Sequence, residues 1–405
     1  MRSKPSDTSQ DLALTLDLGA EPTAPRAEAI PGQNGAMDDL AEARVIAPIF
    51  DPQRLRVARQ LRKKTRAAVA DGVGVSAAAV GQWEAGEVRP KAQTLTQLAE
   101  ELEFPVAFFA TGGHSVPDLA IHNGFFRSLR KGRQIDREAA IAHAALVAEV
   151  VDVIERHAKL PDLDIPSYPL SIDASPHEVE QAAAQVRAHW GLGTEPIDDM
   201  TVELERRGAA VVRLVLAEDV DAFSWGKAKR PVVILGSDKG KRDRSRFDAA
   251  HELAHLVMHA DRPDPANRDL ERQAHRFAGA LLLPSEQLVA EWRPGRISWA
   301  YLLTLKQRWQ VSLAALLYRA RDLELITQTA YESAIKYSSR RGWRKHEPGD
   351  LGPPERPQLL TRAVEALEAA GVDRTQLADE AHIHVADLER YLVAPGARPR
   401  VSVEI

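Results

Sequence analysis

Residues 246–260 read RFDAAHELAHLVMHA, and the HExxH pattern within them, from His251 to His255, decides how the centre of this chain is interpreted. The stretch has helical character, and residues four apart on an α-helix lie one turn apart on the same face. Both imidazoles can therefore reach one metal ion, while Glu252 can lie beside a water at that ion. The pattern is typical of zinc sites that activate water as a nucleophile.

A third metal ligand is predicted at Glu271, 16 residues beyond the second histidine. Residues 269–283 carry apolar side chains at helical spacing, and Pro284 ends this predicted helix. Two histidines and one glutamate leave a coordination position open for water, as catalytic zinc requires. Three further side chains are weaker candidates for a contact to the metal or to a reacting carbonyl, because such residues are more often structural: His259, His275 and Tyr301.

Residues 205–330 resemble the ImmA/IrrE family of zinc peptidases. The resemblance is carried by RFDAAHELAHLVMH, ERQAHRFAGALLLP and LKQRWQVSLAALLYRARDLELI. It implies that His251, His255 and Glu271 bind Zn2+ and that Glu252 is the general acid and base. It also implies that the substrate is a repressor-type protein.

The composition of the chain limits the class of protein and the kinds of metal site that are possible. The chain has 405 residues, 44% of them hydrophobic and 27% charged, which is ordinary for two or three globular domains. It has no cysteine, so disulfides, iron–sulfur clusters and cysteine-ligated zinc are excluded. A formal net charge of -5 confines any DNA-binding face to a local surface. Without a long apolar run or an N-terminal signal pattern, we expect a cytoplasmic protein.

The chain divides into six predicted parts, and the fold class is mainly α with a small β-sheet (α+β). In order, they are a disordered tail (1–45), a five-helix repressor-like DNA-binding domain (50–112), a connector with a long helix (113–165), a zincin-like peptidase domain (166–335), a linker (336–357) and a helical C-terminal module (358–405). Helices are expected over 52–64, 67–72, 76–86, 91–102, 136–159, 176–190, 196–207, 246–260, 269–283, 299–309 and 312–323. Strands are expected over 209–216 and 231–235.

Residues 54–102 resemble the xenobiotic-response-element (XRE) type of helix-turn-helix, in which a second helix enters the major groove. The signature is Trp83-Glu84-Ala85-Gly86 followed by Arg89-Pro90, and Trp83 is expected to be structural. Seven basic residues between Arg54 and Arg66 form a cluster that can neutralise phosphates, although such a cluster is often only a solvated helix face. Six side chains are predicted to contact double-stranded DNA: Arg66, Ser76, Ala77, Gln82, Arg89 and Lys91.

The alanine-rich start of the recognition helix offers little direct base readout, so we expect specificity to come from a homodimer or from DNA shape. The acidic C-terminal module is expected to serve packing or dimerisation. Three hypotheses remain open. In the first, the chain is a regulator with a fused zinc endopeptidase that cleaves itself or a partner. In the second, it is a regulator whose peptidase-like domain only senses a ligand or holds structure. In the third, it is a peptidase whose helix-turn-helix recognises a protein partner.

Overall fold

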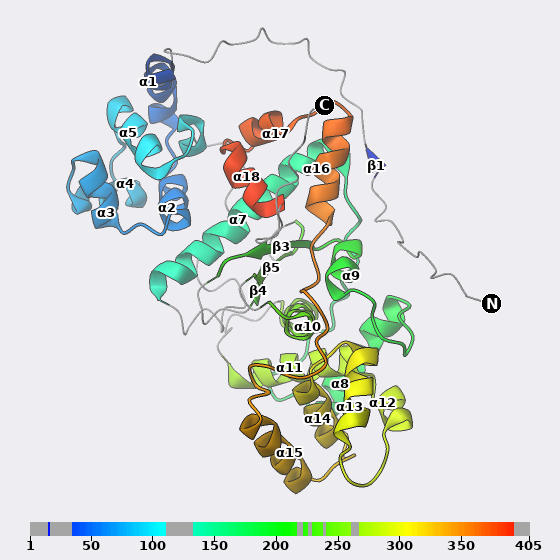
Figure 1. Ribbon diagram of the computed structural model, residues 1–405. Coiled ribbons are helices and arrows are strands. Elements are labelled where there is room, and N and C mark those ends of the chain that lie inside the picture. Colours follow the sequence, from blue (N-terminus) through cyan, green and yellow to red (C-terminus); the bar gives the residue numbers. More distant parts are fainter. Residues whose placement is uncertain are drawn as a thin grey trace, which may run out of the picture.

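The computed structural model describes residues 15–16, 35–110, 133–216, 222–225, 229–237, 240–260 and 267–392. The predicted fold class is confirmed, because the described residues are mainly helical with one small three-stranded sheet (Figure 1). A two-residue strand, β1 (Thr15–Leu16), also pairs with β2 (Ala158–Lys159). No described helix has the length and apolar character that crossing a membrane requires.

In the N-terminal helical domain, the helices α3 (Arg66–Val73) and α4 (Ala77–Ala85) begin and end at the capping residues of the sequence. The domain also contains α2 (Pro52–Leu61), α5 (Ala92–Leu102) and the 3-10 turn η2 (Val106–Phe109). The side chains of Thr65 and Ser76 accept the backbone N–H groups that open α3 and α4. Gly74 and Gly86 end these helices in the left-handed conformation that glycine tolerates. The short turn between these two helices places α3 in contact with α4, as in a helix-turn-helix.

The expected disordered tail ends earlier than the sequence suggested. Residues Gly35–Ile46 form helix α1, so the prediction of disorder is wrong for residues 35–45. Helix α1 contacts α5 and η2, and the side chains of Ala43 and Ile46 are buried there. Tertiary packing stabilises a segment whose own hydrophobic pattern is weak. Residues 1–14 and 17–34 of the predicted tail lie outside the described residues.

The sheet separates two cores. Its strands β3 (Ala210–Leu214), β4 (Ala222–Trp225) and β5 (Val232–Gly236) have the order β3-β5-β4, with β3 and β5 parallel and β4 antiparallel to β5. The sequence predicts β3 and β5 but misses β4. Because side chains alternate between the faces of a strand, Val212 and Ile234 join one core while Val211 and Val233 join the other.

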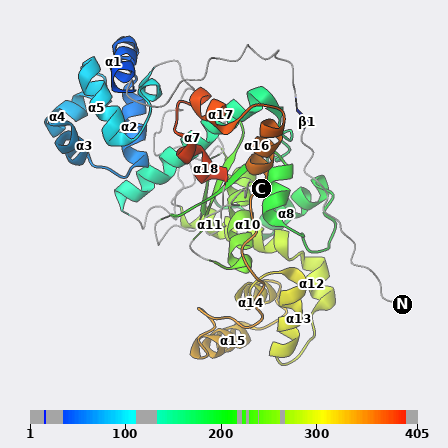
Figure 2. The ribbon, with the colours of Figure 1, turned by 45° about the horizontal axis from the view of Figure 1, so that its top comes forward.

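One face of the sheet packs on α7 (Gln134–His157) and the C-terminal module. That module consists of α16 (Leu359–Ala369), α17 (Arg374–Glu380) and α18 (Val385–Leu392), and it contacts α7 and β3. Figures 1 and 2 show α16 and α17 beside α7. The N-terminal domain belongs to the same continuous core, since α2 packs directly on α7.

The other face packs on α10 (Arg242–Met258), the helix that carries the HExxH pattern. Helix α11 (Arg268–Leu282) lies against α10, and α8 (Pro176–His189) lies against α11. The domain is completed by α9 (Met200–Arg206), α12 (Ser285–Glu291), α13 (Trp299–Trp309), α14 (Leu313–Asp322) and α15 (Gln328–Arg340). Helices α12 and α15 are absent from the sequence prediction, and α15 occupies the first residues of the predicted linker.

A buried ion pair holds the remainder of the predicted linker in place. Glu355 pairs with Arg246 of α10, and both side chains are fully buried. The Glu355 carboxylate also accepts the backbone N–H groups of Met200 and Thr201 at the start of α9. The segment is therefore part of the packed domain instead of a free connector.

Glu205 ties the C-terminal module to this domain and gives a pH-dependent contribution to stability. Its buried carboxyl accepts the backbone N–H groups of Gln358 and Leu359 at 3.0 Å. Burial raises the pKa of Glu205 to about 8, although these two hydrogen bonds act in the opposite direction. The folded protein thus keeps a proton that the unfolded chain loses near pH 4.5.

We therefore expect the contribution of Glu205 to the free energy of unfolding to fall as pH rises from about 4.5 to about 8, by at most about 1.4 kcal/mol per pH unit. Urea unfolding across this interval measures the effect. Glu205→Gln removes the titration, so its unfolding free energy should fall less steeply than that of the wild type. Equal slopes for the two proteins would contradict the assignment.

Candidate functional site

Helices α10 and α11 bring together the three predicted metal ligands. The Nε2 atoms of His251 and His255 lie 3.2 Å apart. A carboxylate oxygen of Glu271, on the first turn of α11, lies 3.4 Å from the former, and the other oxygen lies 3.6 Å from the latter. Their potential ligand atoms all lie within 4.8 Å of one another. Among the described residues this is the one group of at least three His, Cys, Asp or Glu side chains that could hold a metal ion.

The charges of these side chains fit a bound cation. Burial acts to lower the pKa of His251, but the hydrogen bond with Glu271 and the nearby carboxylates raise it overall. Burial lowers the pKa of His255 to about 3, so this imidazole is neutral at pH 7. Burial acts to raise the pKa of Glu271, but the two histidines lower it overall. Two imidazole nitrogens and a carboxylate thus converge on one point. A cation at that point would complement the negative charge of the Glu271 carboxylate.

Glu252 lies on the same helix but outside the ligand group. Its Oε2 atom accepts a hydrogen bond of 2.7 Å from the hydroxyl of Ser224 on β4. Burial raises the pKa of Glu252 to about 7, and His251 and Ser224 limit that rise. A carboxyl with this pKa can accept and release a proton near neutral pH. The sequence does not indicate Ser224 as a functional residue, because β4 is a strand of only four residues.

The three weaker candidates have different surroundings. His259 is fully buried and contacts His255 through its Nδ1 atom instead of joining the ligand group. His275 is exposed, and its ring centroid lies 4.7 Å from that of His251. The Tyr301 hydroxyl donates to the backbone carbonyl of Glu291 in another part of the domain. Of these contacts, the one from His259 is a hydrogen bond to a candidate ligand histidine.

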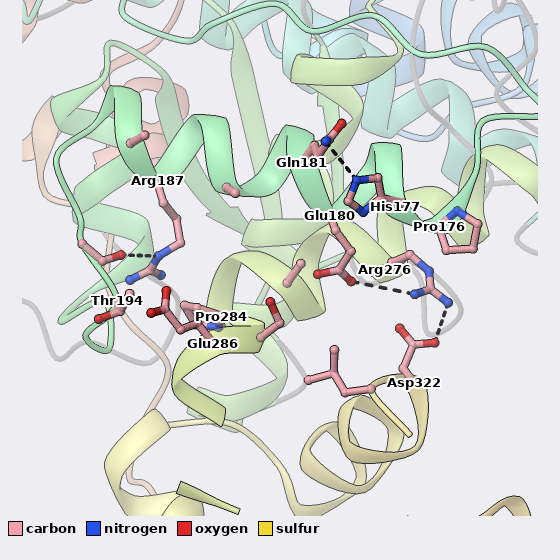
Figure 3. A pocket seen from close by; sticks show the side chains of 16 residues that line it. Pro176, His177, Glu180, Gln181, Arg187, Thr194, Arg276, Pro284, Glu286 and Asp322 are labelled. Atoms are coloured by element: carbon pink, nitrogen blue, oxygen red, sulfur yellow. Dashed lines mark hydrogen bonds and ion pairs between the residues drawn. The ribbon is translucent and has the colours of Figure 1, made fainter. Parts of the chain in front are cut away.

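A separate cavity of about 650 Å³ lies on the far side of α11. Its lining residues Arg276 and Ala280 follow Glu271 by five and nine positions, which places them roughly half a turn around the helix. Figure 3 shows Arg276 between Glu180 of α8 and Asp322 of α14, and Arg276 donates to Asp322. The cavity contains none of the three candidate ligand residues, so it is distinct from the candidate metal group.

The six predicted DNA-contacting residues lie on the surface of the helix-turn-helix. Arg66, Ser76, Ala77, Gln82, Arg89 and Lys91 are all exposed. The Ser76 hydroxyl caps α4, while the guanidinium groups of Arg66 and Arg89 also bond to Glu84 and to the Pro48 carbonyl. Trp83 is buried, as its predicted structural role requires.

The basic cluster from Arg54 to Arg66 is matched inside the protein. Each of its seven side chains donates to an acceptor of the same chain: Arg54 to Glu149, Arg56 to the Glu84 carbonyl, Arg59 and Arg66 to Glu84, Arg62 to Asp387, Lys63 to Asp136 and Lys64 to Glu101. Pairs with α7 and α18 fix the domain to the rest of the chain. Its contacts thus favour a structural role over the predicted neutralisation of phosphates.

Two parts of the sequence match known protein families. Residues 204–321 match the peptidase M78 family, described as the IrrE N-terminal-like domain. Residues 55–109 match the helix-turn-helix family. No curated protein matches the chain. The candidate metal ligands and Glu252 lie within the first match, and the six predicted DNA-contacting residues lie within the second.

Proposed function

Because the chain joins a helix-turn-helix domain to an IrrE N-terminal-like domain, we propose that it is a DNA-binding transcriptional regulator that carries a zinc-dependent endopeptidase. The observation that carries this proposal is the convergence of His251, His255 and Glu271, with Glu252 on the same helix. Two imidazoles and one carboxylate form a donor set that zinc prefers in peptidases.

The chemistry follows from these side chains. Zinc held by His251, His255 and Glu271 would supply Lewis acidity for a peptide carbonyl and for a water molecule. Glu252 takes a proton from the attacking water and delivers it to the leaving amine as the peptide C–N bond breaks. Ser224 orients the carboxylate by donating to Oε2. The cleaved bond belongs to this chain or to a repressor-type partner.

Metal analysis combined with intact-mass measurement tests this proposal. The protein purified with zinc should contain zinc in equimolar amount, and incubation should yield fragments of the chain itself or of an added repressor encoded beside it. Retention of zinc with both substrates intact would count against the peptidase.

The cavity behind α11 favours a second candidate function. In this alternative the central domain binds a small molecule and alters DNA binding without cleaving a peptide. The cavity walls combine apolar side chains with the Arg276, Glu180 and Asp322 charges, and α11 connects them to Glu271. DNA affinity that changes with a small molecule, equally in the wild type and in Glu252→Gln, would favour this alternative.

DNA binding by the helix-turn-helix face should depend on few phosphate contacts. Lys91 is exposed, and its side chain has no hydrogen-bond or ion-pair partner among the described residues. We expect Lys91→Ala to make the plot of log affinity against log salt concentration less steep by about 0.9 per bound chain, because one phosphate contact is lost. Fluorescence anisotropy at several salt concentrations measures this slope.

The matched control is Lys336→Ala, because Lys336 is also exposed but lies on α15, at the end of the molecule away from α3 and α4 (Figures 1 and 2). Its slope should equal that of the wild type. A Lys91→Ala slope that also equals the wild type would remove Lys91 from the DNA interface. We further propose that two copies bind together, since one recognition helix offers little base readout.

A further inference from the structure

A buried chain of hydrogen bonds leads away from the metal centre. The Nδ1 atom of His255 lies 3.1 Å from Nδ1 of His259, and Nε2 of His259 lies 2.9 Å from Oε1 of Gln273. The Gln273 amide nitrogen lies 2.8 Å from the backbone oxygen of Ser171 and 3.1 Å from that of Ile172. The side chains of His255, His259 and Gln273 are all at least nine-tenths buried.

The two backbone oxygens determine which atom donates and which accepts in every hydrogen bond of this series. Carbonyl oxygens only accept, so the Gln273 nitrogen donates to them and its Oε1 atom faces His259 as an acceptor. His259 must then carry its proton on Nε2, which leaves a lone pair on Nδ1 of the neutral ring. That lone pair accepts the proton of His255 Nδ1.

We propose that His259 and Gln273 are positioning residues that hold His255 in the Nδ1–H tautomer, with the Nε2 lone pair directed at the metal centre. The inference rests on the proposed metal site at His251, His255 and Glu271. A ligand histidine whose other nitrogen is held by a fixed acceptor keeps both its ring orientation and its tautomer. His259 therefore acts on the metal through His255.

The two ligand histidines differ in this respect. The buried Nδ1 atom of His251 has no hydrogen-bond partner among the described residues. Loss of the His259 acceptor should therefore alter the tautomer of His255 alone. This difference provides a spectroscopic signature that a general loss of packing does not produce.

Zinc titration of the full-length metal-free protein is the first test. His259→Leu removes the acceptor and should weaken zinc affinity about 10–100-fold. His259→Asn returns an acceptor oxygen near the position of Nδ1 and should recover affinity to within about threefold of the wild type. Gln273→Leu, further from the metal, should weaken affinity less than His259→Leu. His177→Leu, an exposed histidine on α8, is the control and should bind zinc as the wild type does.

The second test uses nitrogen-15 NMR of the metal-free protein with labelled histidine, with His255 assigned by comparison with His255→Gln. The wild type and His259→Asn should show the His255 ring protonated at Nδ1, and His259→Leu should show a mixture of tautomers. Wild-type zinc affinity and an unchanged His255 signal in both His259→Leu and Gln273→Leu would overturn the proposal.

These readouts separate the inference from the proposed function. A wild type that binds zinc but cleaves nothing leaves the hydrogen-bond chain supported if the affinities and tautomers change as expected. A wild type that binds no zinc contradicts the metal site on which both rest, and the inference is then lost with it.

Discussion

Replacing His255 by alanine is expected to abolish retention of zinc. The imidazole supplies one of three converging ligand atoms, and its loss leaves only His251 and Glu271. Metal content of the dialysed protein should fall from equimolar to background. Because a ligand that binds only the folded state stabilises it by about 2.7 kcal/mol at 100 times its dissociation constant, zinc should also raise the melting temperature of the wild type but not that of His255→Ala.

The matched control for this experiment is His275→Ala. His275 is on α11 and its ring lies close to His251, but it is not part of the ligand group. This variant should retain zinc. If His275→Ala lost the metal and His255→Ala kept it, the assignment of ligands would be wrong.

Glu252→Gln is expected to retain zinc and to slow peptide cleavage about 10²–10⁴-fold, the range typical of a lost general acid and base. The amide has nearly the same shape and can still accept from Ser224, but it cannot take a proton. Cleavage rates under single-turnover conditions, together with metal content, measure the effect. Ser224→Ala should retain zinc and give a smaller decrease, because it removes only the group that orients the carboxylate.

The outcomes divide the proposed functions clearly. A Glu252→Gln protein that cleaves at the wild-type rate would exclude Glu252 as the proton carrier. A wild type and variant that both bind zinc, both fail to cleave and respond equally to a small molecule would favour the ligand-sensing alternative.

The parts of the fold that could be predicted from sequence depend on local signals. Ser76 and Gly86 mark the two ends of α4, and Pro284 follows the end of α11, so these helices have nearly the predicted limits. The approach of His251 to His255 was also predictable, because their spacing is a property of one helix. Glu271 comes from a second helix, and it was proposed because a carboxylate completes a two-His, one-Glu zinc set and because the family resemblance implies it.

The parts that could not be predicted depend on contacts between distant residues. Arg62 pairs with Asp387, 325 positions away, and Glu355 with Arg246, 109 positions away. Such pairs connect the basic cluster to α18 and hold part of the predicted linker against α10. The same limitation applies to Ser224, since nothing in a four-residue strand indicates that its hydroxyl meets Glu252.

The proposed metal site is tested by an anomalous-difference map at the zinc absorption edge from crystals of the zinc-loaded protein. The proposed function predicts a single strong peak per chain, in contact with His251, His255 and Glu271, and not with Glu252. A peak at other side chains, or no peak at this group after incubation with zinc, would contradict it.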